Sequence, residues 1–151
     1  MIPERIFVEG FLCYREPQEA CFGDCTLWML SGPNGSGKSA LFDAVTFTLY
    51  GQHRAGRQNA RGLINEDSDG FVLEIDFALE EHRFRARRTL SRYGRPTRQI
   101  YQWSSNDELG EWHAVHETHT EQGFTQWIHE NIALTYETFT ASVLLLQGKA
   151  D

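Results

Sequence analysis

The sequence predicts an α/β fold in which a glycine-rich loop and a helix lie beside an antiparallel β-meander. Residues 32–39 read GPNGSGKS, with a short apolar run before them and an apolar helical stretch after them. Residues 71–115 contain several stretches in which apolar and polar side chains alternate, as they do in half-buried strands. The chain has 151 residues and 40% hydrophobic content, so it can bury a core, and its length indicates one domain over residues 1–151.

The first elements lead into and out of the glycine-rich loop. Residues 5–11 read as a first strand and residues 19–22 as a short second one. The apolar run over residues 26–30 is predicted to be a buried strand that feeds the loop. Residues 40–50 predict a buried helix, and Gly51 is expected to end it, because glycine readily adopts the left-handed conformation found at helix C-termini.

The meander is predicted from the alternation that follows a polar, glycine-bearing connection over residues 51–70. In residues 71–79 every odd-numbered side chain is apolar, which gives this strand one buried face. It is expected to pair with an arginine-rich strand through a turn at residues 80–82. The strands expected in this region cover residues 71–79, 83–90, 98–103 and 111–115.

Two helices and a last strand are expected near the C-terminal end. Thr118 and Glu121 have the spacing of a capping box, which predicts that a helix begins there. Thr135 is expected to cap a second, shorter helix, and residues 143–146 read as an apolar strand that ends at Gln147. The side chains predicted to share the apolar face of the first helix are Phe124, Trp127 and Ile128.

The glycine-rich loop matches the phosphate-binding pattern G-x-x-x-x-G-K-[ST]. Its glycines allow successive N–H groups to turn inward around phosphate oxygens, and the positive end of the next helix adds to this field. Lys38 is expected to reach the β and γ phosphates and Ser39 to ligate Mg²⁺. The alternative is a turn that contains lysine and serine by chance. The residues expected to contact a nucleotide triphosphate are Asn34, Gly35, Ser36, Gly37, Lys38, Ser39 and Ala40.

The charge of the chain is unevenly distributed. The net charge is −7, yet residues 82–98 contain seven arginines and no acid. Alternation places Arg83, Arg85 and Arg87 on one face of the predicted strand. Two interpretations follow: these arginines pair with acids of a neighbouring strand, or they contact DNA phosphates.

Several classes of protein are excluded by composition. No run of eighteen apolar residues occurs, which argues against a membrane span. The first residues, MIPER, do not begin a secretory signal, so a cytoplasmic location is expected. The three cysteines, Cys13, Cys21 and Cys25, are odd in number and suit reduced thiols.

Three sequence blocks resemble the N-terminal ATPase half of the SbcC-type, SMC-like DNA repair ATPases. They are RIFVEGFLCYRE, SGPNGSGKSALFDAVTFTLYG and YETFTASVLLLQGKAD, in the order found in that family. The resemblance implies a P-loop NTPase fold, namely the N-terminal lobe of an ABC-type ATPase head, with ATP and Mg²⁺ as cofactors. It also implies that the natural protein continues into a long coiled coil after Asp151.

The resemblance assigns roles to further residues. Gln147 matches a glutamine that contacts Mg²⁺ or the attacking water, so Lys38 and Gln147 are the implied catalytic residues and Ser39 and Gln147 the implied metal ligands. The alternative is that Gln147 is an ordinary polar residue at a strand end. Ile64 is expected near the adenine and ribose. Relatives carry a basic residue where this chain has Leu12.

The resemblance also implies partners. A C-terminal half of the same head would supply the remaining catalytic motifs, and ATP would join two copies of the head into a dimer. A metal-dependent nuclease subunit and double-stranded DNA are the other implied partners. Two other functions remain open: a chromosome-organising clamp of SMC or RecF type without a nuclease, and a small P-loop kinase, against which the meander argues.

Overall fold

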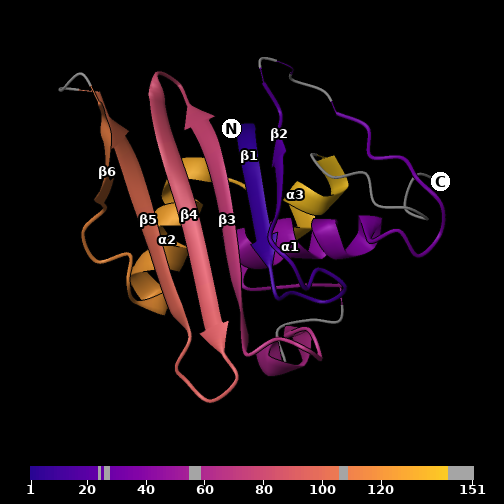
Figure 1. Ribbon diagram of the computed structural model, residues 1–151. Helices are drawn as coiled ribbons and strands as arrows, with labels where there is room; N and C mark the ends of the chain where they lie inside the picture. The colour runs from indigo at the N-terminus through magenta and orange to yellow at the C-terminus, as the bar shows by residue number, and fades with distance from the viewer. Residues whose placement is uncertain (24, 26–27, 55–58, 106–108, 143–151) are drawn as a thin grey trace.

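The protein folds as a six-stranded antiparallel sheet with helices on one face (Figure 1). The structure, a computed structural model, describes residues 1–23, 25, 28–54, 59–105 and 109–142. The strand order is β2-β1-β3-β4-β5-β6, so β3 to β6 form a meander in chain order. The strands are β1 Ile2–Glu9, β2 Gln18–Cys21, β3 Gly70–Leu79, β4 His82–Ser91, β5 Thr97–Ser104 and β6 Glu111–Ala114.

The central hairpin of the meander confirms the prediction from alternation. β3 and β4 pair from Gly70 opposite Ser91 to Leu79 opposite His82, which leaves Glu80 and Glu81 as the turn. The odd-numbered apolar side chains of β3 face the helices, and residues 71, 73, 75 and 77 are buried. The α/β class and the antiparallel meander are therefore both confirmed.

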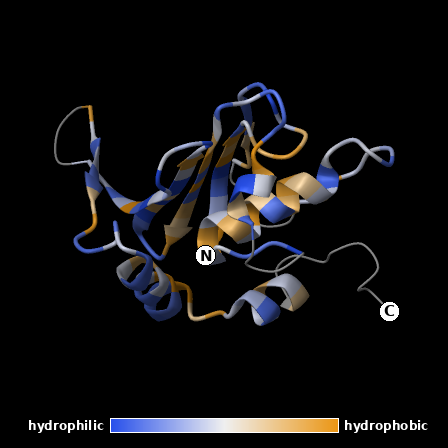
Figure 2. Ribbon diagram, turned by 90° about the horizontal axis from the view of Figure 1, so that it is seen from below, coloured by the Kyte–Doolittle hydropathy of each residue, from blue (hydrophilic) through white to orange (hydrophobic). Residues whose placement is uncertain are grey.

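Three α-helices and a short 3-10 helix cover one face of this sheet and close the core. Helix α1, the longest of them, packs against β1, β3 and β4, while α2 packs against β5 (Figure 2). Phe11, Phe47 and Phe71 meet at the centre, with two of the three ring pairs edge to face. None of the helices in the described residues is both long enough and apolar enough for a membrane crossing. The helices are α1 Lys38–Tyr50, η1 Ala60–Leu63, α2 Glu121–Ile132 and α3 Tyr136–Ser142.

The helix ends agree with the sequence prediction at two of three positions. Gly51 ends α1 in the left-handed conformation, and the Thr135 hydroxyl accepts the Thr138 N–H at the start of α3. The expected capping box at Thr118 is wrong, because Thr120 caps α2 by accepting the Gly123 N–H. Thr118 is instead buried between β5 and the segment after β6.

The predicted strand before the glycine-rich loop is not found in the residues described. Trp28, Met29 and Leu30 lie outside any strand and are 50%, 86% and 41% exposed. The described part of the chain offers them no strand partner, because β2, at the nearer edge of the sheet, pairs only with β1. Residues 26–27 and the last expected strand, residues 143–146, lie outside the described residues.

Candidate nucleotide-binding site

The glycine-rich loop lies directly at the start of helix α1. Gly35 and Gly37 have φ values of +82° and +90°, a conformation that a residue with a side chain rarely adopts. Gly37 is the N-cap of α1, and no side chain caps the first N–H groups of this helix. These N–H groups therefore need acceptors from outside the helix.

An open cleft of about 280 Å³ is formed at this point. Its lining includes Lys38, whose ammonium group pairs with no carboxylate among the described residues, so the cleft favours an anion. The Ser39 hydroxyl is the group in this lining that suits a divalent cation bound together with phosphates. The residues that line the cleft are Asn34, Gly35, Gly37, Lys38, Ser39, Ala40 and Arg54.

Lys38 folds back over its own loop. Its Nζ donates to the carbonyl oxygens of Gly32 at 2.5 Å and Pro33 at 2.7 Å, and to the Ser36 Oγ at 3.4 Å. These acceptors are neutral groups, and a triphosphate in the cleft would offer the ammonium group stronger, charged ones. The side chain that the motif assigns to the phosphates is thus held at the mouth of the cleft.

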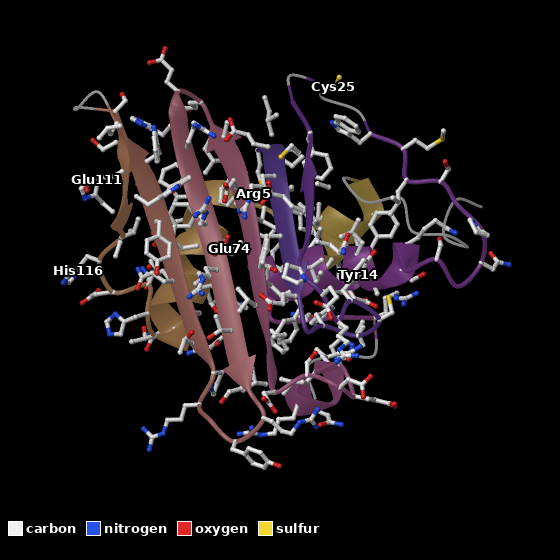
Figure 3. All side chains as sticks on the ribbon, viewed as in Figure 1. Arg5, Tyr14, Cys25, Glu74, Glu111 and His116 are labelled. Carbon is white, nitrogen blue, oxygen red and sulfur yellow. The ribbon has the colours of Figure 1, made fainter. Side chains whose placement is uncertain are left out.

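A tight turn between Phe11 and Tyr14, which sequence analysis did not identify, lies against the glycine-rich loop. Tyr14 lies close to α1 (Figure 3), and its hydroxyl donates to the Gly37 carbonyl at 3.1 Å. A Cβ at Gly37 would lie only 2.9 Å from the Tyr14 Oη and 3.0 Å from the Cys13 Sγ. Burial raises the pKa of Tyr14, so this hydroxyl remains a donor at neutral pH.

Arg54 is a second cleft residue that sequence reasoning missed. It follows α1, and its guanidinium binds both carboxylate oxygens of Asp43 at 2.9 to 3.1 Å. The Asp43 side chain is only 6% exposed, and it stands one turn after Ser39 on the same side of α1. A single arginine in a polar connection carries no sequence signal for such a role.

Ile64 does not lie in the cleft. Its side chain is buried in the hydrophobic core, and its backbone pairs with Phe11. The contact with adenine or ribose that the resemblance implies for Ile64 stays a prediction. Asn65, which follows, uses its side-chain amide to donate to the Leu12 carbonyl at 2.6 Å.

Part of the expected site cannot be compared with the structure. Gln147 lies outside the described residues, so its implied roles as a catalytic residue and as a metal ligand stay predictions. Most of the residues expected to contact the nucleotide line one cleft: Asn34, Gly35, Gly37, Lys38, Ser39 and Ala40. Ser36 does not line this cleft, but its hydroxyl accepts a hydrogen bond from Lys38.

The predicted arginine face is present and its side chains are paired. Arg85 binds both oxygens of Asp76 at 2.6 and 2.8 Å, and Arg87 binds Glu74 at 3.0 Å. Arg5 joins the same group, and it lies beside Glu74 on the face turned away from the helices (Figure 3). The four arginines of this face, Arg5, Arg83, Arg85 and Arg87, are matched by the acids Glu4, Glu19, Glu74 and Asp76.

Comparisons with known proteins agree with the site and the fold. A family model described as "AAA domain" matches residues 5–150. The SbcC component of the nuclease SbcCD from Deinococcus radiodurans is 31% identical over 99% of this chain and 16% of the relative. A probable DNA double-strand break repair Rad50 ATPase from Aquifex aeolicus is 27% identical over 100% of this chain and 15% of the relative. The chain thus spans about a sixth of the length of these relatives.

A solved structure supports the fold assignment. It comes from work titled "Structural biochemistry of ATP-driven dimerization and DNA stimulated activation of SMC ATPases". The match has a TM-score of 0.70, covers 99% of this chain and 88% of that one, and has 20% sequence identity, so it shows the fold alone. The family model over nearly the whole chain shows that the chain belongs to the AAA-domain family, and the relatives that match it over its whole length are SbcC and Rad50 ATPases.

Proposed function

We propose that this chain is the ATP-binding part of a DNA-repair ATPase head that needs a C-terminal half for hydrolysis. The observation that carries the proposal is the cleft at the start of α1, where loop glycines with positive φ, Lys38 and Ser39 meet. Backbone N–H groups and a lysine in this arrangement are suited to the phosphates of ATP. Ser39 and Gln147 would hold Mg²⁺, which would neutralise charge on the phosphates.

The exposed apolar segment before the loop supports the need for a C-terminal half. Trp28, Met29 and Leu30 are consecutive in the chain shortly before the glycine-rich loop, and each exposes a large apolar side chain. Exposed apolar patches of this kind mark surfaces that another segment covers. Strands from the C-terminal half would convert residues 26–30 into the buried strand that the sequence predicts, and would bring the missing catalytic groups to the cleft.

The proposed mechanism is a clamp driven by nucleotide binding. ATP held by the loop of one head would also contact a second head. The free energy of ATP binding would therefore also stabilise the dimer of heads. Lys38 would leave the carbonyl oxygens of its own loop and bind the β and γ phosphates. Tyr14 and the Arg54–Asp43 pair would hold the loop and the first turns of α1 in place while this exchange occurs.

The further partners in the proposal come from the relatives. The relative from Deinococcus radiodurans is named as a nuclease subunit and the one from Aquifex aeolicus as a DNA double-strand break repair ATPase, which supports a nuclease partner and double-stranded DNA as substrate. We further propose that the nuclease is metal-dependent and that the protein acts in the cytoplasm. The pairing of Arg83, Arg85 and Arg87 with acids favours the structural interpretation of this face over direct contact with DNA. Charge reversal of these three arginines in the full head should then leave the salt dependence of DNA binding unchanged. A flatter salt dependence would instead support direct contact of these arginines with DNA phosphates.

The first test is binding of a non-hydrolysable ATP analogue with Mg²⁺, measured by titration calorimetry. Lys38→Ala should weaken binding about tenfold to a hundredfold, because a charged hydrogen-bond partner of the phosphates is lost. Arg83→Ala is the matched control, since Arg83 is half exposed and pairs with Glu4 on the sheet face turned away from the helices. No binding by the wild-type chain, or equal loss in both variants, would refute the proposal.

The second test concerns hydrolysis and separates the other functions. The chain alone should hydrolyse ATP negligibly, and addition of the C-terminal half should restore turnover that Lys38→Ala abolishes. Transfer of phosphate from ATP to a nucleotide or metabolite by the chain alone would indicate a kinase instead. Failure of the complete head to capture any nuclease would favour the chromosome-organising clamp.

A further inference from the structure

A second cavity lies at the opposite end of α1 from the nucleotide cleft. It has a volume of about 350 Å³, within the range of small-molecule sites. Its walls come from the C-terminal end of α1, the start of α2 and strands β3, β4 and β5. Because α1 has 13 residues, this cavity is about 20 Å from the phosphate-binding loop. Its apolar walls include Phe47, Phe71 and Leu90.

Two arginines lie side by side in the wall of this cavity and share one carboxylate. Arg88 of β4 is the direct register partner of Arg98 of β5, and both residues line the cavity on the helix-covered side of the sheet. Glu121 lies 3.3 and 3.4 Å from the Arg88 nitrogens and 2.7 Å from the Arg98 Nε. Like charges directly opposite in neighbouring strands repel each other, and one carboxylate balances only one of the two. The cavity therefore carries an excess positive charge.

The burial of Arg88 makes this excess costly. Its side chain is only 6% exposed, and its guanidinium lies 4.4 Å from the ring centre of Phe124 and 5.9 Å from that of Phe47. Its Nε donates to the Thr48 carbonyl at 2.8 Å. The other two guanidinium nitrogens donate to Glu121 over the longer distances of 3.3 and 3.4 Å. Burial lowers the pKa of Arg88, because the Glu121 charge does not fully replace the lost water.

Two hydrogen-bond donors in the wall of the cavity lack an acceptor. Within the part of the chain that the structure describes, only the Tyr50 hydroxyl and the Arg98 Nε are buried side-chain polar atoms without a hydrogen-bond partner. The Arg98 Nε is close to Glu121, but the pair does not have hydrogen-bond geometry. Both residues line this same cavity. Buried donors without acceptors are rare in proteins and call for a partner.

We propose that this cavity is a binding site for a small organic anion with a carboxylate or phosphate head and an apolar body. The head would lie between Arg88 and Arg98, accept from the Arg98 Nε and the Tyr50 hydroxyl, and balance the second arginine. The apolar body would lie against Phe47, Phe71 and Leu90. A purely structural role, in which Arg88 and Arg98 both hold Glu121 at the start of α2, accounts for the two arginines but leaves the second positive charge and the Tyr50 hydroxyl without a partner.

The test uses benzoate and phenyl phosphate as probes of the full chain by NMR. Both should cause saturable shifts of the Arg98 Nε–H signal and of the Gly51 amide, which borders the cavity. Arg98→Met should weaken probe binding at least about tenfold, because a charged hydrogen bond is lost. Arg87→Met is the matched control on the same strand pair, because Arg87 faces away from the helices and binds Glu74; this variant should bind the probes like the wild type.

The outcomes separate a binding site from a structural ion pair. A folded Arg98→Met that binds the probes like the wild type would indicate that Arg98 serves only in the ion pair with Glu121, and would overturn the proposal. Shifts confined to the phosphate-loop amides, or no saturable shift, would also overturn it. If Arg98→Met fails to fold, Tyr50→Phe provides the second variant, with probe binding weakened about twofold to tenfold by loss of one hydroxyl donor. Unchanged probe binding in Tyr50→Phe would count against the site.

Discussion

Replacement of Thr118 by valine removes one hydroxyl from the buried junction between β5 and α2. This hydroxyl accepts from the Ile100 N–H at 3.0 Å and from the Gln99 Nε2 at 2.6 Å, and it donates to the Val115 carbonyl at 2.9 Å. Gln99 retains two carbonyl acceptors, Ile100 and Val115, so its amide stays bonded. The Ile100 N–H, in contrast, is left buried without an acceptor.

The expected cost follows from this single orphaned donor. An unsatisfied buried N–H destabilises a protein by about 1–3 kcal/mol, and valine has nearly the shape of threonine, so no cavity adds to the loss. The control is Thr48→Val in α1. Thr48 is as deeply buried as Thr118, but its hydroxyl only donates to the Ala44 carbonyl, which keeps its helical N–H partner. We expect less than about 1 kcal/mol for this change.

Urea denaturation measures both changes in the free energy of unfolding. Thr118→Val should lower the transition midpoint while leaving the slope with urea unchanged, since the surface exposed on unfolding stays the same. Thr48→Val should have nearly the midpoint of the wild type. Equal midpoints for the two variants would refute the view that the Thr118 hydroxyl serves as the acceptor for β5.

Three further predictions concern the cleft and the buried tyrosine. Tyr14→Phe should weaken ATP binding about twofold to tenfold in calorimetry while the melting temperature stays unchanged, because only the hydrogen bond to Gly37 is lost. Gly37→Ala should abolish binding, since φ is +90° and the new Cβ would meet Tyr14; tight binding by this variant would contradict the account of the loop. Burial raises the pKa of Tyr50 from 10.0 to about 12, so one phenol should titrate late in an absorbance titration. The stability it contributes should be full below pH 10.0 and be lost as the pH rises to about 12, and Tyr50→Phe should remove this dependence.

The sheet was predictable because its strands carry their own signal. Strict alternation from Phe71 to Leu79 fixes which face of β3 is buried, and the same period in β4 fixes the arginine face. The alternation also places Asp76 opposite Arg85, although it cannot indicate that the carboxylate becomes buried under two arginines. Burial of that kind depends on side chains from three strands.

The predictions that failed depend on neighbours that are distant in sequence. Thr118 has the spacing of a cap, but the hydrogen bonds of Ile100 and Gln99 draw its hydroxyl into the sheet, so Thr120 serves as the cap. Ile64 pairs with Phe11 and is buried in the core, a placement that its local sequence does not indicate. Arg88 is a charged residue on the otherwise apolar inner face of β4. This interruption of the alternation is a sequence signal that could have indicated a buried charge.

The candidate site was predictable where a motif fixes the backbone and not where tertiary contacts do. The glycine positions and Lys38 follow from the motif alone. Tyr14 reaches the loop and Arg54 the cleft only because a turn after β1 and the connection after α1 both lie beside the loop. The sequence around Tyr14 and around Arg54 contains no pattern that predicts these contacts.

The order of strands in the sheet has a consequence for folding kinetics. Strands β3 to β6 each pair with the next strand in the chain, so most of the sheet forms through short loop closures. The meander can therefore fold early and act as a template for β1 and α1. Residues 28–30 form no strand with any neighbour in the described part of the chain, and their exposed apolar side chains make this segment prone to aggregation in unassembled molecules.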